Sequence, residues 1–138
     1  MTFQNILITG ANRGIGLELA RQFLALKPKN LIATTRLPSV VLDQLKSANA
    51  NLHVLPYDAT DFDSYASFVA QVQQIVGSDE GLDLLVNNAG IYIRDNLDTV
   101  TPKNILANIE TNSVAPLMLT KELLPLLKVS FFRGIFVE

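Results

Sequence analysis

The sequence of 138 residues contains no cysteine and only one histidine, His53. The absence of cysteine excludes a disulfide framework, a thiolate metal site and a cysteine nucleophile. A single histidine argues against a multi-histidine metal site and against a serine hydrolase. We therefore predict that the chain holds no metal ion, and that His53 is a satisfied or edge histidine on a strand.

The sequence also lacks a large excess of charge of either sign. Eleven Lys and Arg stand against thirteen Asp and Glu, which gives a formal net charge of −2. A protein that binds a phosphate backbone normally carries a clustered basic excess, so we expect no nucleic-acid partner. Hydrophobic residues make up 49% of the chain, enough for the core of one domain at most.

Long apolar runs are missing as well. The richest apolar stretch, 114–132, is interrupted by Lys121, Glu122 and Lys128. It falls short of the roughly 18 consecutive apolar residues that indicate a membrane span. The residues after Met1 show no positive region and no small-residue cleavage site, so no secretory signal is recognised. We predict a cytoplasmic protein with no membrane partner.

Short apolar runs alternate with segments of helical periodicity. Strands are predicted at 6–9, 30–35, 52–55 and 82–86, with a candidate fifth strand at 134–137. The apolar faces of the first three predicted helices are Ile15, Leu19, Phe23 and Leu26; then Val41, Leu42 and Leu45; then Tyr65, Val69, Val72 and Val76.

Capping residues mark the ends of the later helices. Asp61 is predicted to cap the third helix and Gly77 to end it. Thr101 and Pro102 begin a fourth helical segment that runs to about residue 128. We expect it to be broken near 112–116, because proline disfavours an unbroken helix. Strands that alternate with helices predict an α/β fold, a doubly wound parallel sheet of Rossmann type.

A glycine-rich loop, Gly-Ala-Asn-Arg-Gly-Ile-Gly at 10–16, lies between the first strand and the first helix. Glycine permits positive φ and leaves no Cβ between the backbone and an incoming phosphate. The N–H groups and the dipole at the start of the next helix favour an anion. We predict a phosphate-binding loop, with a tight structural turn as the alternative. No Gly-Lys-Ser/Thr follows, which disfavours a nucleoside-triphosphate P-loop.

Arg36 bears on the choice between NAD and NADP. Dinucleotide-binding folds hold the ribose 2′-hydroxyl with an acidic residue about 20 residues after the loop. Counting from Gly16 leads to Arg36, and no carboxylate stands there. Arginine suits a 2′-phosphate, and Arg13 is within reach of the same group. We predict NADP(H), with NAD less favoured; the alternative is that both arginines are solvated. The missing acid also disfavours a methyltransferase.

Two motifs resemble those of the short-chain dehydrogenase/reductase family. Thr-Gly-Ala-Asn-Arg-Gly-Ile-Gly at 9–16 resembles its Thr-Gly-x-x-x-Gly-x-Gly loop, and Asn-Asn-Ala-Gly at 87–90 resembles its second hallmark. The stretches 111–117 and 123–127 are similar to the sniffer-like and C-factor-like carbonyl reductase branch. The resemblance implies an NADP(H)-dependent oxidoreductase that, in its full-length form, reduces carbonyl groups of small molecules by hydride transfer.

The same resemblance implies roles for single residues. Asp58 would contact adenine, with a turn carboxylate as the alternative, and Asn87 would brace the sheet. Ala89 and Gly90 would pass under the adenine ribose. Asn112 matches the asparagine whose helix kink positions a water in the proton relay, so it is the one candidate catalytic residue.

Within the glycine loop, the glycines would shape the pyrophosphate site and Ile15 would back the nicotinamide side. The complete set of predicted cofactor contacts is Gly10, Asn12, Arg13, Gly14, Ile15, Gly16, Arg36, Asp58, Ala59, Asn88, Ala89 and Gly90.

The family delivers its proton from a Tyr-x-x-x-Lys pair and polarises the carbonyl with a serine. None of the three tyrosines, at positions 57, 65 and 92, has a lysine four residues later. We therefore expect 1–138 to be an incomplete NAD(P)-binding domain, truncated at its C-terminal end, family-like over 6–128 and with an atypical tail at 129–138. A splice end, a shifted frame and a truncated gene model remain open as origins of the tail.

Two other interpretations of the chain remain. It is either a catalytically inactive nucleotide-binding fragment or isoform, or a product without function because it folds poorly. The family often pairs through the helix that corresponds to 114–128 and the one after it, so a homodimer also remains open.

Overall fold

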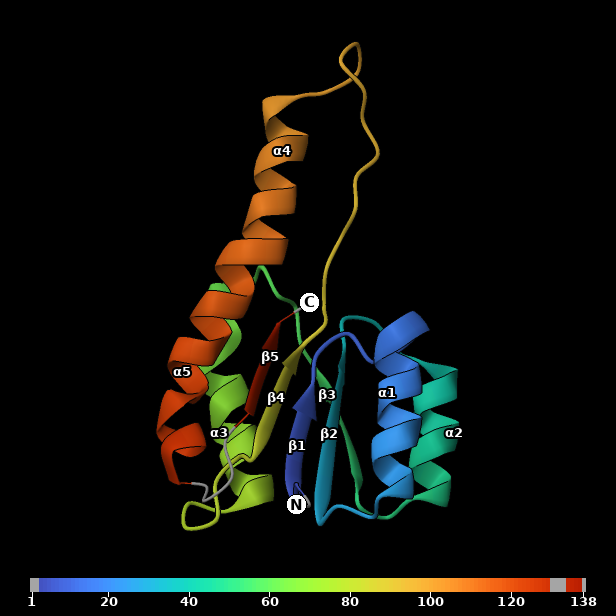
Figure 1. The fold of residues 1–138 in the computed structure, drawn as a ribbon, viewed down its shortest axis with the longest axis vertical. Helices are drawn as coiled ribbons and strands as arrows, with labels where there is room; N and C mark the ends of the chain where they lie inside the picture. The colour runs from blue at the N-terminus through green and yellow to red at the C-terminus, as the bar shows by residue number, and fades with distance from the viewer. Residues whose placement is uncertain (1–2, 130–133, 138) are drawn as a thin grey trace.

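The structure is a computed structural model that describes residues 3–129 and 134–137. In this part of the chain the strands are β1 (Asn5–Ile8), β2 (Asn30–Thr35), β3 (Leu52–Pro56), β4 (Leu84–Asn87) and β5 (Gly134–Val137). They form one parallel sheet in the order β3-β2-β1-β4-β5 (Figure 1). The strand order reverses between β1 and β4, as in a doubly wound Rossmann-type fold.

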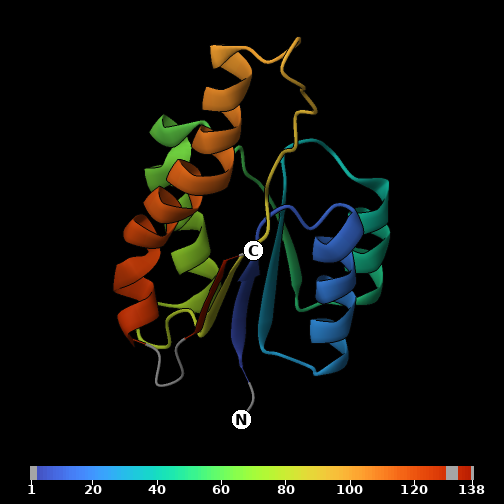
Figure 2. The same cartoon turned by 45° about the horizontal axis from the view of Figure 1, so that its top comes forward.

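Helices cover both faces of this sheet. They are α1 (Gly14–Ala25), α2 (Val40–Ala48), α3 (Tyr65–Val76), α4 (Pro102–Ile109) and α5 (Ala115–Val129), with a 3-10 turn η1 (Phe62–Ser64) and a π-helical turn η2 (Glu110–Val114). Figure 2 shows α1 and α2 on one side and α3 and α5 on the other. The helix α4 extends beyond the carboxyl ends of the strands (Figure 1).

Alternate residues of β1, β2, β3 and β4 pack into two separate apolar layers. Ile6 and Ile8 of β1 lie in the layer under α1 and α2, whereas Leu7 lies in the layer under α3 and α5. In β4, Leu85 likewise faces α3 and α5. Each large apolar side chain buried in this way contributes about 1.5–3 kcal/mol. The near-continuous apolar strands of the sequence follow from this burial on both faces.

The buried face of α1 corrects the predicted one. In the predicted row, Leu19 and Phe23 are partly buried and pack against the core, but the fully buried row is Gly16, Ala20 and Leu24. Ile15 is 60% exposed. Small residues let a helix approach the sheet closely, and hydrophobic periodicity does not mark such a row.

The start of α3 also differs from the prediction. The side chain of Asp61 makes no capping hydrogen bond, and η1 separates it from the helix. Its backbone carbonyl instead accepts the hydroxyl of Ser64 at 2.8 Å. Phe68 joins the buried face, whereas Val69 is only partly buried.

The break expected near 112–116 is a π-helical turn within a continuous helical segment. Pro116 has no N–H to donate to the carbonyl of Asn112, four residues earlier. In η2 the N–H of Ala115 bonds to the carbonyl of Glu110, five residues earlier. Single π turns of this kind often occur at functional sites.

The fifth strand is confirmed, because β5 pairs with β4 in parallel from Leu84 opposite Gly134 to Asn87 opposite Val137. Residues 130–133 and 138 of the predicted atypical tail lie outside the described residues. Within the described ranges, no helix combines the length and apolar character needed to cross a bilayer.

Candidate functional site

A cavity of about 710 Å³ lies at the carboxyl ends of the strands. Its walls come from the loop after β1, the ends of β2 and β3, the chain after β4, and the junction of α4 with η2. In open parallel sheets, ligands bind at this edge and at the point where the strand order reverses. The cavity is therefore the candidate site.

The structure brings the predicted cofactor contacts together on this cavity. All twelve line it: Gly10, Asn12, Arg13, Gly14, Ile15, Gly16, Arg36, Asp58, Ala59, Asn88, Ala89 and Gly90. The structure shows their common location on the cavity wall, whereas their contact with a cofactor stays a prediction.

Eight further wall residues were not predicted. They are Thr35, Leu37, Tyr57, Thr60, Ile91, Ala107, Glu110 and Thr111. Thr35 ends β2 and Tyr57 directly follows β3, so their position at the ends of parallel strands was the available signal. Ala107, Glu110 and Thr111 carry no such signal, because only the packing of α4 and η2 brings them to the cavity.

The first turn of α1 lies on the cavity with an uncapped N-terminus. Arg13 is the N-cap residue, and its side chain makes no capping hydrogen bond. The first N–H groups of a helix have no partner within the helix, and the dipole makes this end positive. A Cβ added to Gly14, which has φ +55°, would meet nothing within 4 Å. The backbone here is open to an anion such as a phosphate.

The other two glycines of the loop are required by close packing. A Cβ on Gly10 would lie 2.9 Å from the Cα of Ala89. A Cβ on Gly16 would lie 2.5 Å from the carbonyl oxygen of Gly10 and would also collide with the side-chain amide of Asn88. The loop after β1 and the loop after β4 are thus in contact through positions that only glycine can occupy.

Thr9 and Asn88 tie these two loops together. The hydroxyl oxygen of Thr9 accepts the N–H groups of Asn88 at 3.0 Å and Ala89 at 2.9 Å. The side-chain amide of Asn88 donates to the carbonyls of Thr9 at 2.9 Å and Gly10 at 3.1 Å. Asn88 therefore fixes the shape of the glycine loop in addition to lining the cavity.

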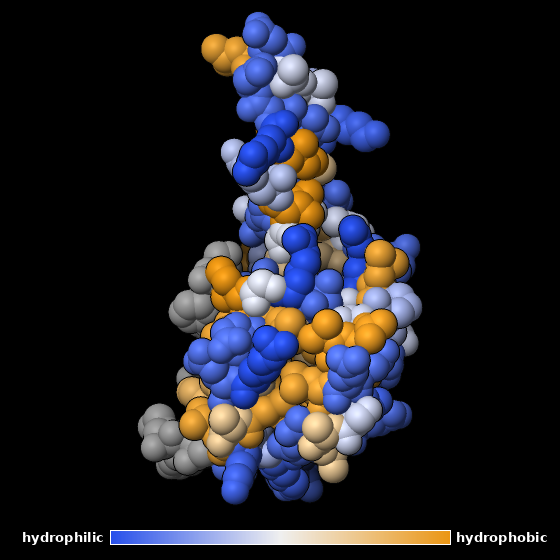
Figure 3. Space-filling view, turned by 90° about the vertical axis from the view of Figure 1, so that its right-hand side faces the viewer, coloured by the Kyte–Doolittle hydropathy of each residue, from blue (hydrophilic) through white to orange (hydrophobic). Residues whose placement is uncertain are grey.

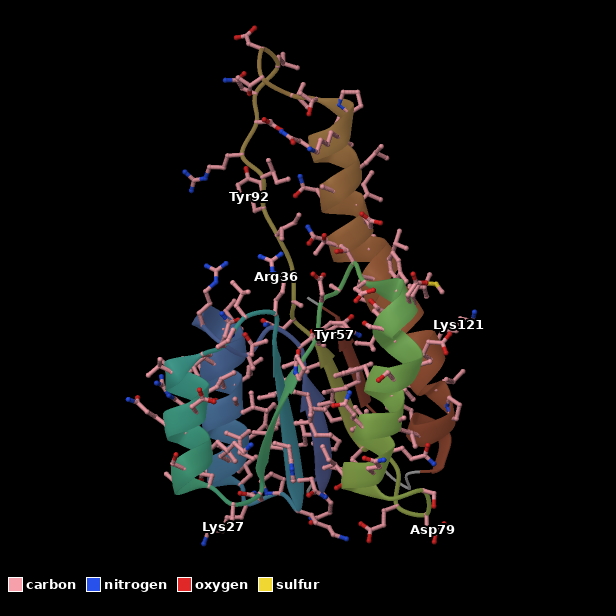
Figure 4. The ribbon with its side chains drawn as sticks, turned by 180° about the vertical axis from the view of Figure 1, so that it is seen from behind. Lys27, Arg36, Tyr57, Asp79, Tyr92 and Lys121 are labelled. Carbon is pink, nitrogen blue, oxygen red and sulfur yellow. The ribbon has the colours of Figure 1, made fainter. Side chains whose placement is uncertain are left out.

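Two arginines supply positive charge at the cavity. Neither Arg13 nor Arg36 forms an ion pair with another described residue. Figure 4 shows Arg36 beyond the carboxyl ends of the strands, above Tyr57. Because no carboxylate stands at the end of β2, this part of the wall suits an anionic group better than a ribose hydroxyl.

Asp58 forms the turn that was considered as the alternative, and its contact with adenine stays a prediction. One carboxylate oxygen accepts the N–H and the hydroxyl of Thr60, each at 2.9 Å, so the residue does form a turn. It also lines the cavity. The turn holds the carboxylate in one orientation on the wall.

The asparagines outside the cavity act as braces. Asn112 lies in η2, where its side chain donates to the carbonyl of Ile91 at 2.8 Å and accepts the N–H of Ile91 at 2.9 Å. Asn87 donates to the hydroxyl of Thr120 at 3.2 Å and so links β4 to α5. The predicted bracing role of Asn87 fits this contact, and the relay role of Asn112 stays a prediction.

The sheet order, the glycine loop and the open helix N-terminus at the reversal point define a Rossmann-type domain. Among the described residues, no group of three or more His, Asp or Glu side chains is placed to hold a metal ion. The family model for short chain dehydrogenases matches residues 4–136. The chain belongs to the short-chain dehydrogenase family.

Individual relatives agree with this assignment. The chain is 32% identical over 128 residues to the ketoacyl reductase HetN of Nostoc sp., a match that covers 91% of this chain and 43% of that protein. It superposes on carbonyl reductase Sniffer of D. melanogaster with a TM-score of 0.85 and 38% identity, covering 91% of this chain and 52% of that one.

A second solved structure is the NADPH-bound carbonyl reductase from chicken fatty liver. The TM-score is 0.88 at 38% identity, and the match covers 94% of this chain and 53% of that one. The chain thus spans about half the length of these solved relatives.

Proposed function

We propose that the chain forms the NADP(H)-binding part of an oxidoreductase that reduces carbonyl groups of small molecules. The observation that carries this proposal is the cavity that joins the uncapped start of α1 to Arg13 and Arg36. The carbonyl reductase from chicken fatty liver binds NADPH, and a short chain dehydrogenase from Burkholderia cenocepacia was solved in complex with NADP. Both similarities support the same cofactor here.

The residues present fit such a cofactor. The N–H groups at the start of α1 donate to the diphosphate, and the absence of a Cβ at Gly14 leaves room for its close approach. Arg13 and Arg36 hold the 2′-phosphate by charge-assisted hydrogen bonds. Asp58 and Ala59 form the wall for the base. When bound, NADPH supplies the hydride for carbonyl reduction.

The preference for NADPH over NADH follows from the arginines. A hydrogen bond to a charged group contributes about 1.5–3 kcal/mol, and about 1.4 kcal/mol corresponds to a factor of ten in affinity. We therefore expect NADPH to bind at least about tenfold more tightly than NADH.

Arg36→Asp tests this assignment. The substitution removes the partner of the 2′-phosphate and places a carboxylate where dinucleotide folds hold a ribose hydroxyl. We expect weaker NADPH binding, stronger NADH binding, and a preference that moves toward NADH, as measured by calorimetric titration.

Arg21→Asp is the matched control for that titration. It makes the same change of charge on an exposed residue of α1 that pairs with Glu18 and does not line the cavity. It should leave the NADPH preference unchanged. Equal affinity of the original chain for NADPH and NADH, or an unchanged preference in Arg36→Asp, would contradict the assignment.

The reduction itself needs groups that the sequence does not contain, since no Tyr-x-x-x-Lys occurs in it. We propose that the 138-residue polypeptide alone binds the dinucleotide without turnover. Carbonyl reduction then belongs to a protein in which a proton donor completes this fold. Pairing of two copies through α5, where Leu117 and Leu124 are exposed, stays a prediction.

A further inference from the structure

Two tyrosines are joined through their hydroxyl groups at the cavity: Tyr57 lies on its wall, and Tyr65 packs against Tyr57. Tyr57 follows β3 and is 7% exposed, and Tyr65 begins α3 and is 3% exposed. Their hydroxyl oxygens are 2.8 Å apart. The hydroxyl of Tyr65 also lies 2.6 Å from the carbonyl oxygen of Ala59. The three groups form one hydrogen-bonded chain.

The direction of this chain is fixed by simple counting. A carbonyl oxygen can only accept, so Tyr65 donates its single hydroxyl proton to Ala59. Tyr57 must then donate to the oxygen of Tyr65. Burial raises the pKa of Tyr57 and of Tyr65 above the ordinary value for tyrosine, so both hydroxyls keep their protons at neutral pH.

One peptide group of the cavity wall is held by hydrogen bonds at both its carbonyl and its N–H. Tyr65 binds the carbonyl of the peptide between Ala59 and Thr60, and a carboxylate oxygen of Asp58 binds its N–H at 2.9 Å. A peptide held at both ends cannot rotate without breaking one of these bonds. Because Asp58, Ala59 and Thr60 all line the cavity, the tyrosines fix the shape of that wall.

We propose that Tyr65, whose hydroxyl oxygen accepts the hydroxyl of Tyr57, is a positioning residue that holds Asp58 and Ala59 in the orientation needed to recognise an adenine base. This inference rests on the proposed function. A fixed carboxylate accepts a hydrogen bond from the amino group of adenine, whereas hypoxanthine has an oxygen at that place. The hydroxyl chain therefore contributes to discrimination between the two bases, and not to affinity for the phosphates.

Tyr65→Phe tests the proposal, because it keeps the ring and removes the hydroxyl. Binding of NADPH and of its hypoxanthine analogue, reduced nicotinamide hypoxanthine dinucleotide phosphate, is measured on each protein by calorimetry. The original chain should prefer NADPH by about tenfold, the value of one charged hydrogen bond. Tyr65→Phe should reduce that ratio to about twofold or less. A purely structural loss would weaken both ligands equally and leave the ratio unchanged.

Two further variants protect the test from a folding failure. Tyr65→Phe leaves the hydroxyl of Tyr57 buried without its partner, which destabilises the fold. The double variant Tyr57→Phe/Tyr65→Phe removes both hydroxyls, so it should recover stability and still lack discrimination. Tyr57→Phe alone keeps the bond from Tyr65 to Ala59, so it should keep most of the preference.

Tyr92→Phe is the matched control, because Tyr92 is 81% exposed and lies well away from Tyr57 (Figure 4). It should leave the ratio unchanged. An original chain that prefers NADPH, together with a double variant that shows the same preference, would overturn this inference and leave the proposed function standing. An original chain that binds neither dinucleotide would overturn both.

Discussion

The three glycines of the loop after β1 meet different physical constraints. Gly14 has φ +55° and open space around it, whereas Gly16 has no positive φ and no room for a Cβ. Gly10 combines a positive φ with close contact to Ala89. A motif of three glycines therefore encodes one position of backbone freedom, one of packing and one of both.

Gly16→Ala should destabilise the protein, because the added Cβ meets the backbone carbonyl of Gly10, which cannot move aside as a flexible side chain would. We expect the free energy of unfolding in urea to fall by about 1–3 kcal/mol, and NADPH binding to weaken with the distorted loop. Gly77→Ala, at the end of α3 with φ +81° and open surroundings, is the control. It should lose stability without losing NADPH affinity; wild-type stability of Gly16→Ala would contradict the packing argument.

Residues whose role can be counted along the chain were predictable. Spacing from Gly16 predicts a cofactor contact at Arg36, and Arg36 lies on the cavity wall. Roles that depend on partners distant in the sequence were not predictable. Thr9 and Ala89, for example, are hydrogen-bonded but 80 positions apart. The same holds for the hydroxyl chain of Tyr57 and Tyr65, which exists only because α3 packs beside the end of β3.

At the scale of elements, the strands were predicted within about two residues because apolar runs bounded by glycine or proline are a direct signal. Helix faces were predicted less well. Gly16 and Ala20 lie on the buried row of α1, and their small size hides that row from a hydrophobic pattern. Whether the helix ends at Pro116 or continues through a π-helical turn also depends on packing, which the sequence pattern does not reveal.

A row of three asparagines holds the chain after β4 against α4 and η2. Asn112 binds both backbone groups of Ile91, and Asn108 accepts the N–H of Ile93 at 3.3 Å. Asn104 donates to the carboxylate of Asp95 at 2.9 Å. Four helical residues rise about 6 Å and two extended residues about 6.6 Å, so the two periods match.

Asn108→Ala should loosen the middle of this row. The N–H of Ile93 loses its acceptor, so its hydrogen exchange should accelerate by about 2–10-fold, the kinetic equivalent of a bond of about 0.5–1.5 kcal/mol. Exchange at Ile32, which is fully buried in β2, is the internal reference and should not change. The contrary result is equal exchange at Ile93 in both proteins.

At the scale of the whole molecule, the amino ends and the carboxyl ends of the strands differ. At the amino ends of the strands, the carboxylate of Asp83 accepts the N–H groups of Gln4 at 2.6 Å and Asn5 at 2.9 Å. These two backbone N–H groups are satisfied by the protein itself. At the carboxyl ends lie the cavity and the open start of α1.

Exposed apolar side chains lie over α1 and α2 and on the cavity wall. Figure 3 shows apolar side chains gathered over the face that α1 and α2 cover. Ile15 and Leu37, both on the cavity wall, are 60% and 66% exposed. A bound dinucleotide would cover part of this apolar area, so the cavity offers both charge for phosphates and apolar contact for flat rings.

The most direct measurement of the central claim is a titration of the ¹⁵N-labelled chain with NADPH, followed through its backbone amide signals. The account predicts saturable shifts at Gly14, Ile15 and Gly16, at Arg36, and in the loops after β3 and β4. Amide signals at the amino ends of the strands, such as that of Asn5, should not shift. Shifts confined to the amino ends of the strands, or the absence of saturable shifts, would contradict the claim that the start of α1 binds the diphosphate.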